Sequence, residues 1–409
     1  MSERKPIVVM KFGGTSVADQ RGRAALAGRV TAALELGQAP VLVVSAMGRR
    51  GAPYATDTLL GLVEGMPADA REDDLLASVG ELVSAVVVAH ELRAAGIVAS
   101  AFSGPEAGVF TDGLLGNAAI TEIRPHRILD AIEEGVVPVI AGFQGLAEDG
   151  TITTLGRGGS DTSACALGVA LAAQEVQIYT DVDGVMTADP RMCEDTEVLH
   201  AILADELFQM ARAGSRVVHT PAAELALNSG LAVRVKNTFS DHPGTLVADI
   251  ASYRPDRVAT AVSHTSGISR VRITLGGPEG TREHMRDQRR IYRAMADASV
   301  SLDMFTPGGD GLVFTVPTAS LPVVEDVLGV LGMRATVRED LAKVTLIGAG
   351  MHGVPGVMAR MTELLDEAGV CVYQSADSHT TISVLVPQAD ARSAIRALHD
   401  GFELADGDE

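Results

Sequence analysis

Two glycine-rich stretches of this chain carry charged residues of the kinds that bind a phosphate or a carboxylate. The first, K-F-G-G-T-S at residues 11–16, follows an apolar run at residues 7–10. The second, L-G-R-G-G-S-D at residues 155–161, follows a short apolar run and precedes a stretch of small residues. Glycines let the backbone turn and approach a ligand closely, and the N–H groups at the start of a helix attract anions. The two stretches therefore predict an anion-binding site at the ends of two strands.

Three side chains in these stretches can do chemistry. Lys11 can neutralise charge that develops on a transferred phosphoryl group, and Arg157 can bind a carboxylate through two parallel hydrogen bonds. Asp161 can orient Lys11 or assist the transfer. The residues Ser160-Asp161-Thr162 can also cap the following helix. A solvated lysine, a helix-end ion pair and an ordinary cap are the alternatives that the residues alone leave open.

A fourth candidate is Glu81, in the motif S-V-G-E at residues 78–81. It lies in a largely apolar helical stretch, where an unpaired carboxylate is costly. We therefore expect Glu81 to have a cationic partner, which is either a substrate ammonium group or a structural arginine.

A polar loop, T-D-V-D-G-V-M-T-A-D-P-R at residues 180–191, follows another apolar run. Its first residues resemble a calcium loop, but the flanking helix and the final glutamate are missing. A nucleotide-binding loop with Arg191 near a phosphate fits better. Phosphoryl transfer depends mainly on positioning and positive charge, which these residues supply. No metal cage is evident, so we expect Mg²⁺ to arrive with the nucleotide.

Residues 1–247 are predicted to form an α/β catalytic domain. Apolar runs alternate with helical periodicity, which is typical of a mostly parallel sheet with helices on both faces. In such sheets ligands bind beyond the carboxyl ends of the strands, where the glycine turns lie. The expected strands are at residues 7–12, 41–45, 98–102, 136–141, 152–155, 176–180 and 232–236, and the expected helices are at 20–36, 73–95, 125–134, 161–173 and 205–213.

The rest of the chain is predicted to contain a linker at residues 248–267 and two βαββαβ units at residues 268–338 and 339–409. The order of strands and helices in the first unit recurs in the second, as expected for paired ferredoxin-like modules. Expected strands are 268–275, 300–305, 311–316, 336–338, 342–347, 370–374 and 381–386, and expected helices are 281–298, 321–331, 354–368 and 388–402.

Composition excludes several classes of partner. The net charge of −20 and the absence of Trp argue against binding to nucleic acid or to an anionic membrane. Residues 82–102 are apolar but contain His90, Glu91 and Arg93, so they are interpreted as a helix running into a strand. The three widely spaced cysteines are interpreted as reduced, mostly buried thiols, and with no signal peptide at the N-terminus they indicate a cytoplasmic protein.

Five motifs in order identify a family resemblance. V-V-M-K-F-G-G-T-S-V, V-S-A-M-G, S-V-G-E, T-T-L-G-R-G-G-S-D-T-S-A and T-D-V-D-G-V-M-T-A-D-P-R together closely resemble aspartokinases. In the second half, G-A-G-M-H-G-V-P-G-V and Q-S-A-D-S-H-T-T-I-S-V-L-V look like the tandem ACT modules of these enzymes. The second of these motifs is most similar to the diaminopimelate-sensitive enzymes of bacilli.

The resemblance implies ATP-dependent phosphorylation of the L-aspartate β-carboxylate to 4-phospho-L-aspartate, the first step towards lysine, diaminopimelate, methionine and threonine. An ionised carboxylate acceptor needs charge relief and alignment but no general base. By resemblance, Lys11 and Asp161 are catalytic. The same resemblance assigns aspartate binding to Thr56, Glu81, Arg157, Gly158, Gly159 and Ser160, nucleotide binding to Gly13, Gly14, Ser45, Thr180, Asp181, Met186, Arg191 and Arg216, and effector binding to Ser301, Leu302 and Asp303.

One position departs from the family pattern. Arg216 stands where aspartokinases usually have a lysine that reaches the nucleotide phosphates, and its guanidinium group is planar and longer. The resemblance also implies a homo-oligomer inhibited by lysine, threonine or meso-diaminopimelate at the ACT modules. Two other functions are weighed: a related kinase acting on glutamate or acetylglutamate, and a non-catalytic amino-acid sensor.

Overall fold

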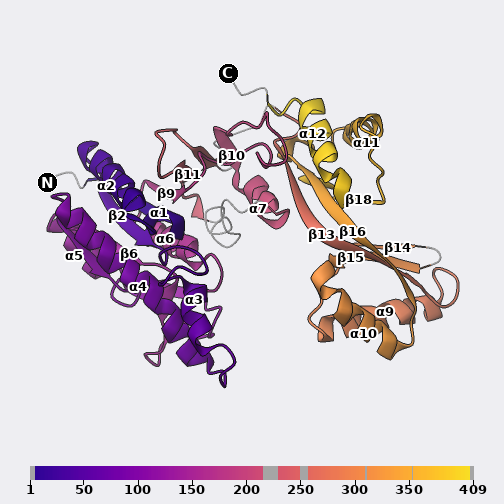
Figure 1. Ribbon diagram of the computed structural model, residues 1–409, viewed down its shortest axis with the longest axis horizontal. Helices are drawn as coiled ribbons and strands as arrows, with labels where there is room; N and C mark the ends of the chain where they lie inside the picture. Colours follow the sequence, from indigo (N-terminus) through magenta and orange to yellow (C-terminus); the bar gives the residue numbers. More distant parts are fainter. Residues whose placement is uncertain (1–4, 215–228, 249–256, 309–310, 352, 406–409) are drawn as a thin grey trace.

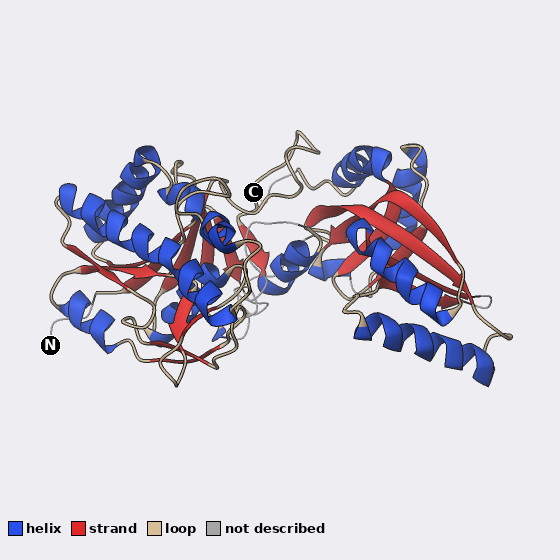
Figure 2. Cartoon of the chain, turned by 60° about the horizontal axis from the view of Figure 1, so that its bottom comes forward, coloured by secondary structure: helices blue, strands red, loops and turns tan. Residues whose placement is uncertain are grey.

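The computed structural model describes residues 5–214, 229–248, 257–308, 311–351 and 353–405. Figure 1 shows an N-terminal α/β half beside a C-terminal half, with helix α7 (Ala204–Arg212) between the two. Figure 2 shows that both halves are built from sheets covered by helices.

The N-terminal half contains an eight-stranded sheet in the order β10-β12-β11-β9-β1-β2-β6-β3. All neighbouring strands run parallel except β11 and β12. Its central strands are apolar along their whole length because both faces are covered, as is usual for parallel sheets. The strands are β1 (Ile7–Phe12), β2 (Ala39–Val44), β3 (Ala99–Phe102), β6 (Val137–Ala141), β9 (Glu175–Thr180), β10 (Ala201–Leu203), β11 (Val233–Asn237) and β12 (Thr245–Ala248).

Two layers of helices bury the faces of this sheet. Helices α2 and α4 pack on the face that carries Val8, Met10 and Phe12, whereas α5, α6 and α7 pack on the face that carries Val9. The helices are α1 (Gly14–Val17), α2 (Gln20–Glu35), α3 (Thr56–Leu60), α4 (Ala70–Ala94), α5 (His126–Glu133) and α6 (Gly159–Ala170). The predicted fold class of this half is confirmed.

A small second sheet, in the order β5-β4-β7-β8, was not predicted. The run at residues 152–155 was expected in the parallel sheet, but β8 (Ile152–Thr154) instead pairs antiparallel with β7 (Gln144–Leu146). The other two strands, β4 (Val109–Thr111) and β5 (Ile120–Ile123), are too short to show a clear period. The prediction of a strand leading into the glycine turn is correct, and its sheet assignment is wrong.

The C-terminal half is one six-stranded antiparallel sheet, β14-β15-β13-β16-β18-β17. Two long strands, β13 (Ala261–Thr274) and β16 (Ala335–Ile347), run through both ferredoxin-like units. The remaining elements are α9 (Arg282–Asp297), β14 (Asp303–Gly308), β15 (Gly311–Pro317), α10 (Leu321–Leu331), α11 (Val357–Glu367), β17 (Gln374–Asp377), β18 (Thr381–Pro387) and α12 (Ala391–Gly401).

The long strands correct the predicted organisation of this half. Residues 261–266, which were assigned to the linker at 248–267, pair with residues 342–347 and complete the sheet of the second unit. The first unit is therefore inserted into the second, and the predicted boundary at 338/339 falls inside β16. The expected strand at 370–374 is also displaced, because β17 begins at Gln374.

Residues 82–102 form the end of α4 followed by β3, as interpreted from the sequence. Helix α4 is long and apolar enough to span a membrane by length and composition, but half of its most apolar window is buried inside the protein. The cysteines are unpaired: Cys165 and Cys193 are buried, and Cys371 is exposed.

Candidate active site

The predicted catalytic residues gather where the order of the parallel strands reverses. Strand β1 lies between β2 and β9, so the chain moves outward from β1 in both directions. Open α/β sheets bind ligands at the carboxyl ends of strands at such a point. Gly13 follows β1, and its N–H donates to the carbonyl of Tyr179 at the end of β9, at 3.2 Å. This bond aligns the first glycine turn with the polar loop after β9.

Lys11 and Asp161 form an ion pair, with 2.6 Å between Nζ of the lysine and Oδ1 of the aspartate. Lys11 occupies the same face of β1 as Val9, which packs against α6, and Asp161 lies in the first turn of α6. The N-cap of α6 is Gly158, with φ of +70°. Because glycine has no side chain, this end of the helix has no side-chain cap. Of the two alternatives for Asp161, helix capping is therefore wrong, and its carboxylate pairs with Lys11.

Glu81 is 3% exposed and lies on α4. Its Oε1 accepts a hydrogen bond from the Ala46 N–H at 3.2 Å, whereas its Oε2 is buried without a hydrogen-bond partner among the described residues. Burial raises the pKa of this carboxyl to about 7, against the opposing effect of its backbone hydrogen bonds. No lysine or arginine among the described residues forms an ion pair with Glu81. Within these residues, the alternative of a structural arginine as its partner is therefore excluded.

Close backbone packing brings Glu81 to the strand ends. A Cβ atom on Gly14 would lie 2.6 Å from the carbonyl oxygen of Ala46, and one on Gly80 would lie 2.7 Å from that of Tyr54. Ser45 follows β2, and its N–H donates to the Phe12 carbonyl at 3.1 Å. The segment after β2 is thus pressed between the first glycine turn and α4, next to Thr56 at the start of α3.

The second glycine turn presents Arg157 to solvent. The side chain is exposed and makes no ion pair with another described residue. Gly159 and Ser160 are buried, and a Cβ atom on Gly159 would lie 2.8 Å from the Phe143 ring. An arginine without an ion pair to any described residue, on a turn fixed by packing, is suited to binding a carboxylate.

The polar loop after β9 begins beside the site and ends beside the C-terminal half. Asp181 accepts from Arg49 at 3.3 Å, which connects the loop to the segment after β2. Met186 pairs with Val198, and the guanidinium of Arg191 binds the Asp189 carboxylate at 2.7 Å. Arg191 therefore has a protein partner here, and its predicted contact with a phosphate stays a prediction. Arg216 lies outside the described residues.

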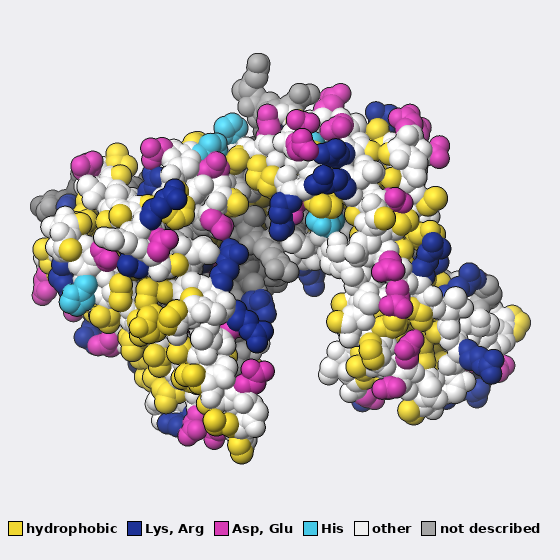
Figure 3. Space-filling view, in the orientation of Figure 1, with side chains coloured by type: hydrophobic (Ala, Val, Ile, Leu, Met, Phe, Trp, Pro, Cys, Tyr) yellow, Lys and Arg dark blue, Asp and Glu magenta, His cyan; other side chains and the backbone are white. Residues whose placement is uncertain are grey.

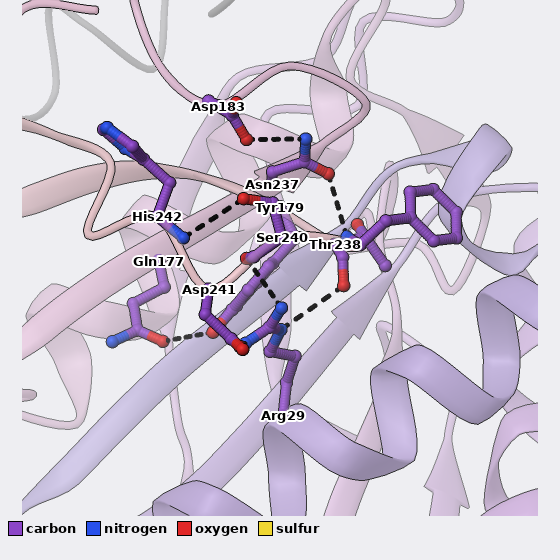
Figure 4. Close-up of polar contacts among 10 residues, drawn as sticks. Arg29, Gln177, Tyr179, Asp183, Asn237, Thr238, Ser240, Asp241 and His242 are labelled. Atoms are coloured by element: carbon purple, nitrogen blue, oxygen red, sulfur yellow. Dashed lines mark hydrogen bonds and ion pairs between the residues drawn. The ribbon is translucent and has the colours of Figure 1, made fainter.

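Sequence reasoning missed one residue that holds this loop and one that holds the neighbouring segment after β11. The Asn237 amide donates to Asp183 at 2.9 Å, and Arg29 from α2 donates to the carbonyls of Thr238 and Ser240 (Figure 4). Asn237 and Arg29 lie outside the glycine-rich motifs, so only their spatial neighbours reveal their roles.

A buried carboxylate on α4, Asp74, was missed as well. It accepts hydrogen bonds from the N–H and hydroxyl groups of Thr154 at 2.9 and 2.7 Å, and from the Gly116 N–H. Because Thr154 ends β8, this carboxylate fixes the strand that leads into the second glycine turn.

The predicted effector residues lie at the start of β14 in the C-terminal half. Leu302 packs against the core of the first ferredoxin-like unit, Ser301 is exposed, and Asp303 forms an ion pair with Lys343 of β16. These residues belong to the C-terminal half and do not contact the Lys11–Asp161 pair.

Among the described residues, one cluster has the spacing of metal ligands: Cys193, His399 and Asp400. It joins the polar loop to α12 and does not include the Lys11–Asp161 pair. The site itself offers a lysine, an arginine, backbone N–H groups and a buried carboxyl whose pKa is raised by burial. This set can stabilise a transferred phosphoryl group and hold an amino acid by both its ammonium and carboxylate groups.

Two known families match the sequence. The amino acid kinase family matches residues 6–237, and the ACT domain matches residues 336–400. The chain is 41% identical to aspartokinase 1 of Bacillus subtilis (strain 168) over 406 residues, which cover 98% of this chain and 99% of that protein. It is 37% identical to an aspartokinase of Thermus thermophilus over 411 residues, 97% of this chain and 99% of that one.

Solved structures show the same architecture. Escherichia coli aspartokinase III in complex with aspartate and ADP superposes with a TM-score of 0.78 at 25% identity, covering 97% of this chain and 100% of that one. The same enzyme with lysine and aspartate, in its T-state, gives 0.79 at 25% identity, covering 97% and 99%. With the kinase-family match over more than half of its length and full-length relatives at 41% and 37% identity, the chain belongs to the aspartokinase family and is an aspartate kinase with an ACT regulatory region.

Proposed function

We propose that this enzyme phosphorylates the β-carboxylate of L-aspartate at the carboxyl ends of β1 and β9, with Lys11 and Asp161 as its catalytic pair. The observation that carries the assignment is their 2.6 Å ion pair, together with Glu81, a buried carboxylate bound to the Ala46 N–H whose Oε2 has no partner among the described residues. Lys11 neutralises charge on the transferred phosphoryl group, and Asp161 holds the lysine in place.

The substrate is held by charge at both ends. Glu81 binds the aspartate ammonium group, and Arg157 binds a carboxylate. Thr56, Gly158, Gly159 and Ser160 complete the aspartate site. ATP is proposed to bind at Gly13, Gly14, Ser45, Thr180, Asp181, Met186, Arg191 and Arg216, and Mg²⁺ enters with it as part of the substrate.

Purified enzyme with ATP, Mg²⁺ and aspartate is expected to form an acyl phosphate that hydroxylamine traps. Lys11→Ala is expected to form it at least about 100-fold more slowly while remaining folded. A panel containing glutamate and acetylglutamate tests acceptor choice. Turnover with those acceptors and not with aspartate would reject the proposed substrate, and a folded wild-type enzyme without any turnover would favour the sensor.

Regulation is proposed to follow the bacillus type, with meso-diaminopimelate as the effector and Ser301, Leu302 and Asp303 as its contacts. Lysine and threonine are the other candidates. Adding each amino acid separately to the hydroxamate assay identifies the inhibitor. We place the enzyme in the cytoplasm, which suits its unpaired cysteines.

A homo-oligomer is proposed as the working form. Hydrophobic side chains gather over the α4 part of the surface in Figure 3. Leu75, Val79, Leu82 and Val86 are exposed there at intervals of four and three residues, the spacing of a seam between paired helices. Sedimentation of the wild type and of a Val79→Glu/Leu82→Glu variant tests this, since a wild type that remains monomeric contradicts the proposal.

A further inference from the structure

The loop between β9 and β10 is shared by the two halves of the molecule. At its start, Asp181 and Asp183 are bound by Arg49 and Asn237 of the kinase domain. Further along, Ala188 and Cys193 are buried in the core that contains Val262 of β13 and Leu398 of α12. The same loop therefore has one end in the candidate nucleotide site and its middle in the second ACT module.

A buried contact between Thr187 and His399 lies at this junction. The Thr187 hydroxyl is 2.9 Å from Nε2 of His399, and the two residues are 1% and 0% exposed. The Thr187 carbonyl accepts from the Val262 N–H at 2.8 Å. A polar contact in an apolar core fixes the positions of both partners, because neither can turn to water.

Thr187 also closes the loop on itself. Its hydroxyl accepts from the N–H of Glu197 at 3.1 Å, and its own N–H donates to the Glu197 carbonyl at 3.0 Å. One residue therefore joins the two arms of the loop, strand β13 and helix α12.

The other polar contacts between this loop and α12 are more exposed. Arg396 of α12 forms an exposed ion pair with Glu194, and Arg392 donates to the Arg191 carbonyl. Exposed ion pairs contribute little to positioning because water competes for both partners. The buried Thr187–His399 contact is therefore the side-chain contact that fixes the loop to α12.

We propose that His399 is a positioning residue for the nucleotide loop: through Thr187 it holds the loop in the conformation that binds ATP. This inference rests on the proposed assignment of Asp181 and Met186 to the nucleotide site. Strand β13 is continuous: near its start Val262 binds Thr187, and its later residues belong to the sheet of the first ACT module. A change in the ACT sheet can thus reach Thr187 directly and alter ATP affinity without altering the aspartate site.

The test compares full-length Thr187→Val, His399→Leu and His399→Gln with a matched control, Thr345→Val. Thr345 is also buried and loses the same hydroxyl, but its partner is Ser383 within the ACT sheet. The terminal amide of Gln can donate or accept where Nε2 lies. KM for ATP and for aspartate, kcat, ADP binding by calorimetry and thermal unfolding are measured for each.

Thr187→Val and His399→Leu are expected to raise the KM for ATP and weaken ADP binding about fivefold or more, with kcat and the KM for aspartate within about twofold of wild type. His399→Gln and Thr345→Val are expected to behave as wild type. The double variant Thr187→Val/His399→Leu is expected to match Thr187→Val, because that single variant already removes the contact with His399.

An unchanged KM for ATP in folded variants, or equal changes for both substrates, would overturn the inference. If His399→Leu fails to fold, Thr187→Val carries the test, since it is nearly isosteric. Asp181→Asn distinguishes failure of the positioning role from failure of the proposed nucleotide site. If it raises the KM for ATP and Thr187→Val does not, only the positioning role fails; if neither changes it, the nucleotide assignment fails as well.

Discussion

Nζ of Lys11 lies 2.6 Å from the Asp161 carboxylate, although Lys11 is the penultimate residue of β1 and Asp161 lies 150 positions later in the first turn of α6. Both side chains are largely buried, so the pair sets the direction of the lysine. Removing the positive charge with Lys11→Ala is expected to lower kcat by about 100-fold or more. Asp161→Asn, which keeps the size of the side chain, is expected to lower kcat less and to leave the KM for aspartate within about threefold. Thermal unfolding controls for folding, and a near-wild-type kcat for Lys11→Ala would contradict the catalytic role.

Aspartate binding is expected to depend on pH through Glu81. Its pKa is raised to about 7 by burial, and only the ionised form attracts the substrate ammonium. The KM for aspartate should therefore fall about tenfold between pH 6 and pH 8. Glu81→Gln should have a high KM that does not change over this range, measured with ATP saturating at each pH. A wild-type KM independent of pH would exclude this role.

The same shift predicts an effect on stability. Because the folded-state pKa of Glu81 is above its unfolded value, the folded enzyme loses stability as pH rises from about 4.5 to about 7, by about 3 kcal/mol in total. Without aspartate at pH 8, Glu81→Gln is expected to unfold at a higher temperature than wild type. Aspartate should stabilise the wild type more than the variant. A lower melting temperature for the variant would show that the Glu81 charge has a partner in the free enzyme.

Arg157 is exposed without an ion pair to a described residue, so its substitution should affect binding and not folding. Arg157→Lys keeps the charge but loses the planar pair of donors, and we expect a KM for aspartate about tenfold higher with an unchanged melting temperature. Arg124→Lys is the matched control, because Arg124 is an exposed arginine paired with Glu122. Equal kinetics for the two variants would argue against carboxylate binding by Arg157.

Glu206 is expected to hold the two halves together. This fully buried carboxylate on α7 accepts from the Thr260 hydroxyl at 2.7 Å and from the Ala349 N–H at 2.8 Å. Glu206→Ala leaves those donors unpaired and is expected to reduce stability by about 3 kcal/mol. Glu194→Gln breaks only an exposed pair and should cost less than about 1 kcal/mol. Calorimetry that finds the two variants equally stable would refute the joint role of Glu206.

The sequence predicted the elements with strong periodicity and the residues with unusual surroundings. Helix α10 spans residues 321–331, as predicted, because its apolar face repeats regularly up to Gly332. Glu81 could be recognised because an unpaired carboxylate inside an apolar helix is energetically costly and therefore indicates a binding partner. Asp74 and Glu206 could not be recognised, since each resembles an acid on the solvated face of a helix until its partners are known.

The insertion of the first ACT unit into the second could not be predicted either. Residues 261–266 are read locally as a polar connection, and they become a strand only because residues 342–347 lie beside them. Pairings between such distant segments leave no local period in the sequence. The Thr187–His399 contact was missed for the same reason.

The insertion of one ACT unit into the other also determines at which residue a fragment containing only the regulatory half can begin. A fragment that starts at Ile268 would contain every helix of the regulatory half, but it would expose the edge of β16 from Ala342 to Ile347. Uncovered strand edges recruit other chains. A regulatory fragment must therefore begin before Ala261 to keep this edge of β16 covered.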